Sequence, residues 1–360
     1  MTRHPLDRAI TVTESRPRHR LAFAAVAVGM GMLAALVIAE TALRASGHEP
    51  WKDFAVHLDM PGMHEPDADL GWRSKEGRYV FGTTPIRMTF WPDHTRATAA
   101  APVLADAAVV VLGCSFVQGW ALSDEETFAW KLQERFVHAR VLNFGTAGYG
   151  TTQSLLALER YLEEQKRTQG AAAARGPLLV VYGFSDFHTG RNIAEASWLR
   201  SLARGSRGLG ATPYATLGGD GELQLHPPKT YPAWWLHRRL ATVATLEQVW
   251  ASFDAMKRTS QANAVTQKLL LELDTVVRRS GGKLLVALLS QFRPRSMAPF
   301  RTLLAEHGIP TAECVHQGVW AKEMQVPVYG HPNAEINAYW AGCIAQAISD
   351  TVPELAGGGT

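Results

Sequence analysis

The sequence predicts an α/β protein, a three-layer sandwich with a mainly parallel sheet, preceded by one N-terminal transmembrane helix. Short apolar runs alternate with stretches of helical periodicity between residues 108 and 348. This alternation is typical of a parallel sheet with helices on both faces. The apolar runs are continuous, as in strands that are buried on both sides. Residues 21–39 carry no charge, and about 20 apolar residues are enough to cross a bilayer.

Composition limits the classes of function. The chain has 360 residues, 46% of them hydrophobic and 19% charged, with a net charge of +3. These values predict a globular protein with a sizeable core and no nucleic-acid partner. Cys114, Cys314 and Cys343 have no metal-site spacing, and no dinucleotide-binding motif occurs, so we expect no metal and no cofactor. One disulfide with one free thiol would fit, but the sequence does not select the pair.

The N-terminal region predicts a single membrane anchor. Residues 1–20 hold several arginines and form the expected cytoplasmic tail, followed by the anchor over residues 21–43. The positive-inside rule then places the rest of the chain outside the cytoplasm, in the periplasm. A cleaved signal peptide and a buried core helix are the alternatives. The apolar region of a signal peptide is usually shorter, about 7–15 residues, and residues 38–40 (Ile-Ala-Glu) make a poor cleavage site.

The remainder divides into a preamble and one large domain. Residues 44–105 are polar and rich in Pro, Gly and Trp, which predicts loops and short strands packed on the main domain. The α/β domain is expected over residues 106–352, with an insertion at about 204–240. Its expected strands cover residues 108–112, 141–143, 178–182, 283–289 and 309–312. Its expected helices cover residues 125–137, 151–169, 240–279, 298–307 and 334–348.

A serine follows the first of these strands. The run Val109 to Leu112 is followed by Gly113-Cys114-Ser115, which places Ser115 at the carboxyl end of a buried strand. Ligands of open α/β sheets bind at this edge. An incidental serine in a tight turn is the simpler alternative.

Polar residues also follow the next two strands. The glycine-rich segment 143–153 leads into a helix, where backbone N–H groups can approach an anion closely; a tight turn that requires positive φ would explain its glycines equally well. Segment 182–188 contains Ser185, Asp186 and His188. Arg191, Asn192 and Trp198 come shortly afterwards and are candidates for shaping a pocket.

A histidine precedes the last expected helix. His331 is followed by Pro332 and by Asn333, a suitable N-cap. A lone histidine is usually structural. In a chain with a serine at a strand end, His331 becomes a candidate general base.

Together these segments resemble the SGNH, or GDSL-like, hydrolase superfamily over about residues 105–350. The resemblance rests on Gly113 to Phe116, Asn143 to Gly148, Gly183 to Asp186 and His331 to Asn333. It implies that Ser115 is the nucleophile, that His331 is the base, and that the N–H groups of Ser115 and Gly148 form the oxyanion hole. The anchor and the Gly71-Trp72-Arg73 preamble are similar to the envelope-attached branch.

The chain departs from the superfamily at two places. Where the third block usually has an oxyanion-donating asparagine, this chain has Ser185, whose hydroxyl is shorter. The acid that usually lies two or three residues before the histidine is replaced by Val328 and Tyr329. A backbone carbonyl would then have to hold the imidazole tautomer, and the imidazolium would lack a charged partner.

Three functions remain open at this point. In the first, Ser115 and His331 form an acyl-serine intermediate, which makes an esterase with water as acceptor or an O-acyltransferase with a sugar hydroxyl. The substrate would be an ester or an acylated carbohydrate of the envelope. In the second, Asp186 or His188 assists. In the third, the site is degenerate and binds a glycan or a partner protein, with the aromatic segment 231–235 as a stacking platform or as a hydrophobic plug.

Overall fold

The computed structural model describes residues 17–55, 62–169, 176–206 and 209–356. The expected cytoplasmic tail therefore lies mostly outside the described residues. The chain forms two compact units. One comprises Met1–Lys52 with Trp234–Glu247, and the other comprises Asp53–Ala233 with Gln248–Thr360.

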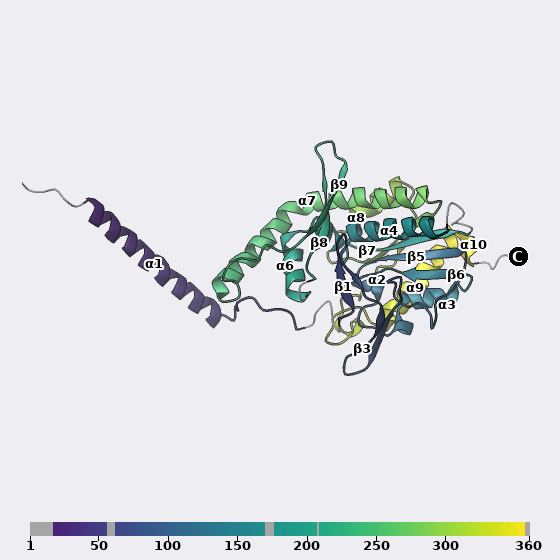
Figure 1. The fold of residues 1–360 in the computed structure, drawn as a ribbon, viewed down its shortest axis with the longest axis horizontal. Helices are drawn as coiled ribbons and strands as arrows, with labels where there is room; N and C mark the ends of the chain where they lie inside the picture. Colours follow the sequence, from purple (N-terminus) through teal and green to yellow (C-terminus); the bar gives the residue numbers. More distant parts are fainter. Residues whose placement is uncertain (1–16, 56–61, 170–175, 207–208, 357–360) are drawn as a thin grey trace, which may run out of the picture. The chain divides into compact units, whose positions relative to one another are not determined.

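The second unit is built on a five-stranded sheet in the order β11-β10-β7-β5-β6; Figure 1 labels β7, β5 and β6 of this sheet. All of its neighbouring strands pair in parallel. The strands are β5 (Ala107–Gly113), β6 (Ala139–Asn143), β7 (Leu178–Ser185), β10 (Lys283–Ser290) and β11 (Thr311–Glu313). The expected mainly parallel sheet is confirmed. The chain adds β6 on one side of β5 and then β7, β10 and β11 on the other side. Ligands of such folds bind beside the strand where the order of addition changes side, here β5.

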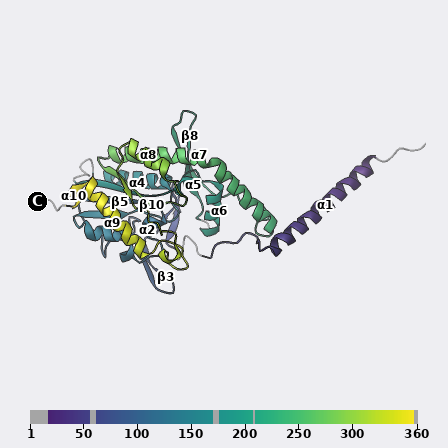
Figure 2. The same ribbon diagram turned by 180° about the vertical axis from the view of Figure 1, so that it is seen from behind.

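Helices cover both faces of the sheet, as Figures 1 and 2 show. Alternate residues of β5 point to opposite faces, so Val109 packs in the core under one helical layer and Val110 in the core under the other. The first layer contains α3 (Phe128–Arg135), α9 (Ala334–Thr351) and α10 (Pro353–Ala356). The second contains α4 (Thr151–Gln169), α7 (Ala241–Arg279) and α8 (Ala298–Glu306). This is the predicted three-layer sandwich.

The preamble forms two antiparallel hairpins in the same unit as the sheet. They are β1 (His64–Asp67) with β2 (Gly71–Ser74), and β3 (Gly77–Phe81) with β4 (Ile86–Phe90). The fully buried Trp72 donates from Nε1 to the carbonyl of Ala147, at 2.9 Å. The first hairpin is thereby fixed to the glycine-rich loop after β6.

One expectation about local structure needs correction. The helix expected over residues 125–137 is split into a 3₁₀ turn (η1, Asp124–Glu126) and α3, because Thr127 is extended and caps α3 through Trp130 N–H. The expected insertion at about 204–240 contains an antiparallel hairpin of β8 (Thr212–Leu217) and β9 (Leu223–Lys229). Ala215 of this hairpin is fully buried in the core of the sandwich, so the segment contributes to that core.

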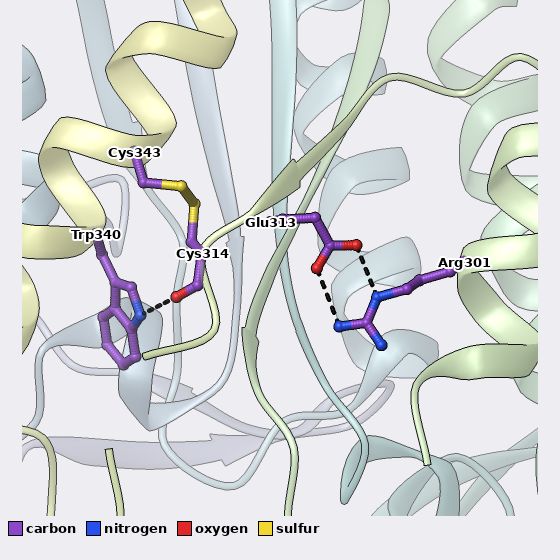
Figure 3. The surroundings of a disulfide bond; sticks show 5 residues. All are labelled: Arg301, Glu313, Cys314, Trp340 and Cys343. Atoms are coloured by element: carbon purple, nitrogen blue, oxygen red, sulfur yellow. Dashed lines mark hydrogen bonds and ion pairs between the residues drawn. A yellow bond between two sulfur atoms is a disulfide. The ribbon is translucent and has the colours of Figure 1, made fainter. Parts of the chain in front are cut away.

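A disulfide joins the last strand region to the last helix. Cys314, directly after β11, is bonded to Cys343 of α9, and Cys114 is left as a buried free thiol. Figure 3 shows Trp340 of α9 donating to the carbonyl of Cys314, at 3.1 Å, and the bidentate ion pair between Arg301 and Glu313. The disulfide that the sequence could not assign therefore joins Cys314 and Cys343.

The first unit contains α1 (Pro17–Ala45) and the start of α7. Leu21–Ala45 is long and apolar enough to cross a membrane, a property that signal sequences share, and none of it is buried in the described chain. Glu40 accepts hydrogen bonds from the backbone N–H groups of Ala241 and Thr242, both at 2.9 Å. The carboxylate satisfies two N–H groups that the first turn of a helix otherwise leaves unpaired.

Candidate active site

Ser115 begins the short helix α2 (Ser115–Gln118), immediately after β5. Gly113 has a φ of +150° and Cys114 is extended, so the chain turns sharply from strand to helix. The turn leaves Ser115 at the carboxyl edge of the sheet, where 7% of its surface is exposed.

Three glycines at three strand ends let α2 lie close to the sheet. A Cβ atom on Gly113 or Gly183 would lie about 2.5 Å or less from Cγ2 of Val117. A Cβ atom on Gly145 would lie 2.5 Å from the backbone nitrogen of Gln118. Real Cβ atoms do not approach other atoms so closely, so α2 keeps this position only with glycine at all three sites.

His331 lies beside Ser115. Its Nε2 is 3.0 Å from Oγ of Ser115, and its Nδ1 is 3.0 Å from the carbonyl oxygen of Tyr329. A carbonyl oxygen only accepts hydrogen bonds, so Nδ1 carries the proton and Nε2 is free to accept from the serine hydroxyl. The structure therefore brings the predicted nucleophile and the predicted base together.

The loop that carries His331 is held at both ends. It lies between η3 (Lys322–Met324) and α9. The N–H of Val326 donates to the carbonyl of His331 at 2.7 Å. Asn333 is the predicted N-cap, and its side chain accepts from the first turn of α9. These bonds fix the position of the imidazole before any ligand arrives.

Aromatic side chains surround the imidazole. The ring centroids of Trp120 and Phe116 lie 4.6 and 5.9 Å from that of His331. Burial in these surroundings lowers the pKa of His331 to about 4; the positive charge of Arg191 acts in the same direction, and the hydrogen bond to the Tyr329 carbonyl opposes them. No carboxylate in the described residues forms an ion pair with His331. The imidazole is therefore neutral at pH 7.

The backbone N–H groups of Ser115 and Gly148 donate to no other group within the described segments. Gly148 has a φ of +86° and lies in the loop after β6. This loop is tied to β5 by the hydrogen bond from Thr146 N–H to Gly113 O, at 3.0 Å. Gly148 therefore adopts the positive φ of a tight turn, which was one of the two explanations for the glycines of this segment. Its N–H also remains available for an anion, which was the other.

The other predicted site residues do not contact Ser115 or His331. Ser185 is fully buried at the end of β7, with its hydroxyl 2.9 Å from that of Ser290. Asp186 accepts a hydrogen bond of 2.6 Å from the N–H of Phe292 in the loop after β10. These contacts give both side chains structural partners.

His188, at the start of α5 (His188–Asn192), is also engaged elsewhere. Its Nδ1 lies 2.8 Å from the hydroxyl of Tyr182, and the residue is fully buried. Burial, with a smaller effect from the charge of Arg191, holds the pKa of His188 well below its usual range. It is therefore a neutral core histidine.

Arg96 is a residue whose importance the sequence did not indicate. It is fully buried and pairs through Nε with Asp124, at 3.0 Å. Its remaining nitrogens donate to the carbonyls of Gln118, Gly119 and Leu122, at 2.7–2.9 Å. Arg96 thus holds the chain that leaves α2. No motif marks it, because its partners are carbonyl groups of a loop.

The sequence indicated Arg191 as a candidate for shaping a pocket, and the structure gives it a defined position. It lies in α5, next to the glycine-rich loop, and donates from Nη1 to the carbonyl of Tyr149, at 2.8 Å. Its positive charge contributes to the lowered pKa of His331. Within the described part of the chain, no group of three or more His, Cys, Asp or Glu side chains is placed to hold a metal ion.

No protein-family model and no curated protein matches the sequence. Among solved structures, a lipolytic protein of the G-D-S-L family from Veillonella parvula aligns at 10% identity over 69% of this chain and 99% of its own, with a TM-score of 0.36. TesA aligns at 15% identity over 68% and 99%, with a TM-score of 0.38. The esterase EstA from Pseudoalteromonas aligns at 11% identity over 69% and 99%, with a TM-score of 0.37.

Proposed function

We propose that the chain is a serine-dependent esterase or O-acyltransferase that acts on acyl esters through an acyl-enzyme on Ser115. The observation that carries this proposal is the 3.0 Å contact between Nε2 of His331 and Oγ of Ser115. The carbonyl of Tyr329 sets the tautomer that this contact requires. Nucleophile, base and orienting group are then in the order that nucleophilic catalysis needs.

In the acylation step, Oγ of Ser115 attacks the carbonyl carbon of the ester while its proton moves to Nε2 of His331. The negative charge on the carbonyl oxygen is accepted by the N–H groups of Ser115 and Gly148. The tetrahedral intermediate then expels the alcohol, which takes the proton from His331. The N–H groups stabilise charge that exists only during reaction, so they lower the barrier rather than tighten ground-state binding.

In the second step an acceptor hydroxyl attacks the acyl-serine and gives its proton to His331. The bond between the acyl carbon and Oγ of Ser115 then breaks, and Oγ takes the proton back from His331. Water as the acceptor completes an esterase reaction, and a sugar hydroxyl completes an O-acyl transfer. Envelope carbohydrate that carries acyl esters is the proposed physiological substrate, because the anchor would place the domain beside it. Ser185 remains the proposed third oxyanion donor; this role requires its hydroxyl to leave Ser290.

We expect turnover to be slow. A pKa of about 4 makes the imidazolium of His331 costly to form, and a carbonyl oxygen compensates its charge less than a carboxylate does. Loss of the acid from a Ser-His-Asp triad lowers kcat by about 10⁴. The same absence favours the alternative function, a site that binds a glycan or a partner protein without turnover.

The proposed location is a single-pass membrane protein with a cytoplasmic N-terminus and a periplasmic α/β domain. Leu21–Ala45 is long and apolar enough to be the span, and the disulfide between Cys314 and Cys343 suits an oxidising compartment. Alkaline phosphatase fused after residue 50 should be active, because this enzyme needs export to fold. Activity only from a cytoplasmic reporter at the same position would reverse the orientation.

Labelling with a fluorophosphonate distinguishes catalysis from binding. The full-length protein in detergent micelles should be labelled on Ser115, and Ser115→Ala should abolish labelling. Ser252→Ala, which removes an exposed hydroxyl from α7, is the control and should be labelled like the parent. His331→Ala should slow labelling by at least about 10²-fold. A folded parent protein that resists labelling would support the binding function.

A further inference from the structure

The guanidinium of Arg191 is held rigidly in the same cluster of side chains as the dyad. Its Cζ lies 4.5 Å from the ring centroid of Phe187 and 4.4 Å from that of Trp198. Such close contacts with aromatic faces are typical of stacked arginines. With Nη1 bonded to the carbonyl of Tyr149, the plane and the rotation of the group are both restricted.

Aromatic contacts connect this guanidinium to the reacting groups. Phe187 packs on Phe116, the residue after Ser115, with ring centroids 5.4 Å apart. Phe116 in turn packs against His331. The carbonyl of Tyr149 that Arg191 binds belongs to the residue after Gly148. Arg191 therefore borders the site on the side of the glycine-rich loop.

The charge of Arg191 has no anionic partner in the described chain. No carboxylate of the described residues lies within ion-pair distance of it, although the side chain is half-buried. The Tyr149 carbonyl and the Cys114 thiol are its polar partners. Two partners do not occupy five N–H donors. A partly buried cation is costly unless a negative group compensates it.

We infer that Arg191 binds a carboxylate group of the ester substrate, so that the preferred substrates are acyl esters carrying one negative charge near the reacting carbonyl. This inference rests on the proposed function. A carboxylate fits because a guanidinium presents paired N–H donors to its two oxygens. A monoanion fits because one guanidinium carries one positive charge to match.

The position of Arg191 also explains why it should select substrates rather than assist with the proton. Its charge opposes formation of the imidazolium on His331. A bound carboxylate would neutralise that charge and ease proton transfer to Nε2. A neutral ester would not neutralise the charge of Arg191, which would continue to oppose the imidazolium. An anionic ester should therefore bind more tightly and react faster than a neutral one.

The test compares esters of equal length with and without a carboxylate. Mono-p-nitrophenyl succinate carries the charge on the acyl chain, and its methyl ester is the neutral reference. Acetoxybenzoate, with its methyl ester, carries the charge on the alcohol side. The parent protein should prefer one anionic ester over its neutral partner by about 10- to 100-fold in kcat/KM, and the pair that shows the preference identifies the side.

Arg191→Gln should remove the preference by lowering kcat/KM for the anionic ester, and it should not lower kcat/KM for the neutral esters, because it also removes the charge that opposes the imidazolium on His331. Arg191→Lys, which keeps the positive charge, should retain part of the preference for the anionic ester. The control Arg140→Gln alters a half-buried arginine on β6 that no proposed step uses, and should keep the full preference. Equal losses on charged and neutral esters would overturn the inference, because they would indicate a role in the oxyanion hole or in folding. A parent protein that hydrolyses anionic and neutral esters equally well would also overturn the inference.

Binding separates this inference from the proposed function. Ser115→Ala should bind monomethyl succinate at least about tenfold more tightly than dimethyl succinate in calorimetric titrations, and Ser115→Ala with Arg191→Gln should bind both alike. This result would support the anion site even if the parent protein showed no labelling and no turnover. Equal affinities in Ser115→Ala would overturn the inference even if esterase activity were present.

Discussion

The carbonyl oxygen of Tyr329 lies 3.0 Å from Nδ1 of His331, where a carboxylate would stand in a complete catalytic triad. A carbonyl sets the tautomer as well as a carboxylate does, but it carries no full negative charge to stabilise the imidazolium. The dyad is thus oriented for base catalysis while its base remains weak.

The pH dependence of activity should reflect this weak base. Because the pKa of His331 is lowered to about 4, the imidazole stays neutral and competent as pH falls through 6.5 and loses its function only near pH 4. At pH 5 about 90% of the protein should retain the neutral base, against about 3% for an unperturbed histidine. Profiles of kcat/KM against pH measure this, and an acid limb centred near pH 6.5 would contradict it.

Replacing Gly145 should damage both the fold and the site. In Gly145→Ala the new Cβ would meet the backbone of Gln118 at 2.5 Å, and α2 would have to move away from the sheet. We expect a loss of about 1–3 kcal/mol in the free energy of unfolding and loss of fluorophosphonate labelling. Denaturant unfolding measures the first effect.

The matched control is Gly219→Ala in the turn between β8 and β9. A Cβ atom there meets nothing within 4 Å, so its unfolding free energy should stay within about 0.5 kcal/mol of the parent value. If both variants behaved alike, close packing at Gly145 would not be the reason for the glycine.

Arg96→Met should be strongly destabilising. It leaves Asp124 without its buried cation and frees the carbonyls of Gln118 and Gly119. Breaking such a buried pair from one side costs about 3–5 kcal/mol. Arg87→Gln breaks the exposed pair with Glu125 in the same region and should cost about 0–1 kcal/mol. Comparable losses in the two variants, measured by urea unfolding, would argue against a special role for Arg96.

Cys343→Ser should lower stability through the unfolded chain. The disulfide spans 29 residues between Cys314 and Cys343, and closing a loop of this size stabilises a protein by about 3–4 kcal/mol in the chain-entropy description. The parent protein treated with reductant should unfold at the same urea concentration as the variant. A parent protein unaffected by reductant, with a Cys343→Ser variant of normal stability, would show that the bond does not form.

The sequence predicted the parallel sheet and the positions of Ser115 and His331 well, since continuous apolar strands and residues at their ends are local signals. It predicted a single helix over residues 125–137 because periodicity continues through Thr127, whereas the backbone there turns to cap α3. The sequence did not indicate Arg96, and it indicated Arg191 only as a candidate for shaping a pocket. Their partners are carbonyls and rings brought together by folding, and no spacing along the chain encodes them.

Ser115 and His331 are separated by 216 positions along the chain. During synthesis the nucleophile leaves the ribosome long before its base, and a nascent or truncated chain that ends before His331 lacks the group that activates the serine. Reactivity at Ser115 should therefore arise late, and a pulse of fluorophosphonate would report completed folding rather than mere presence of the polypeptide.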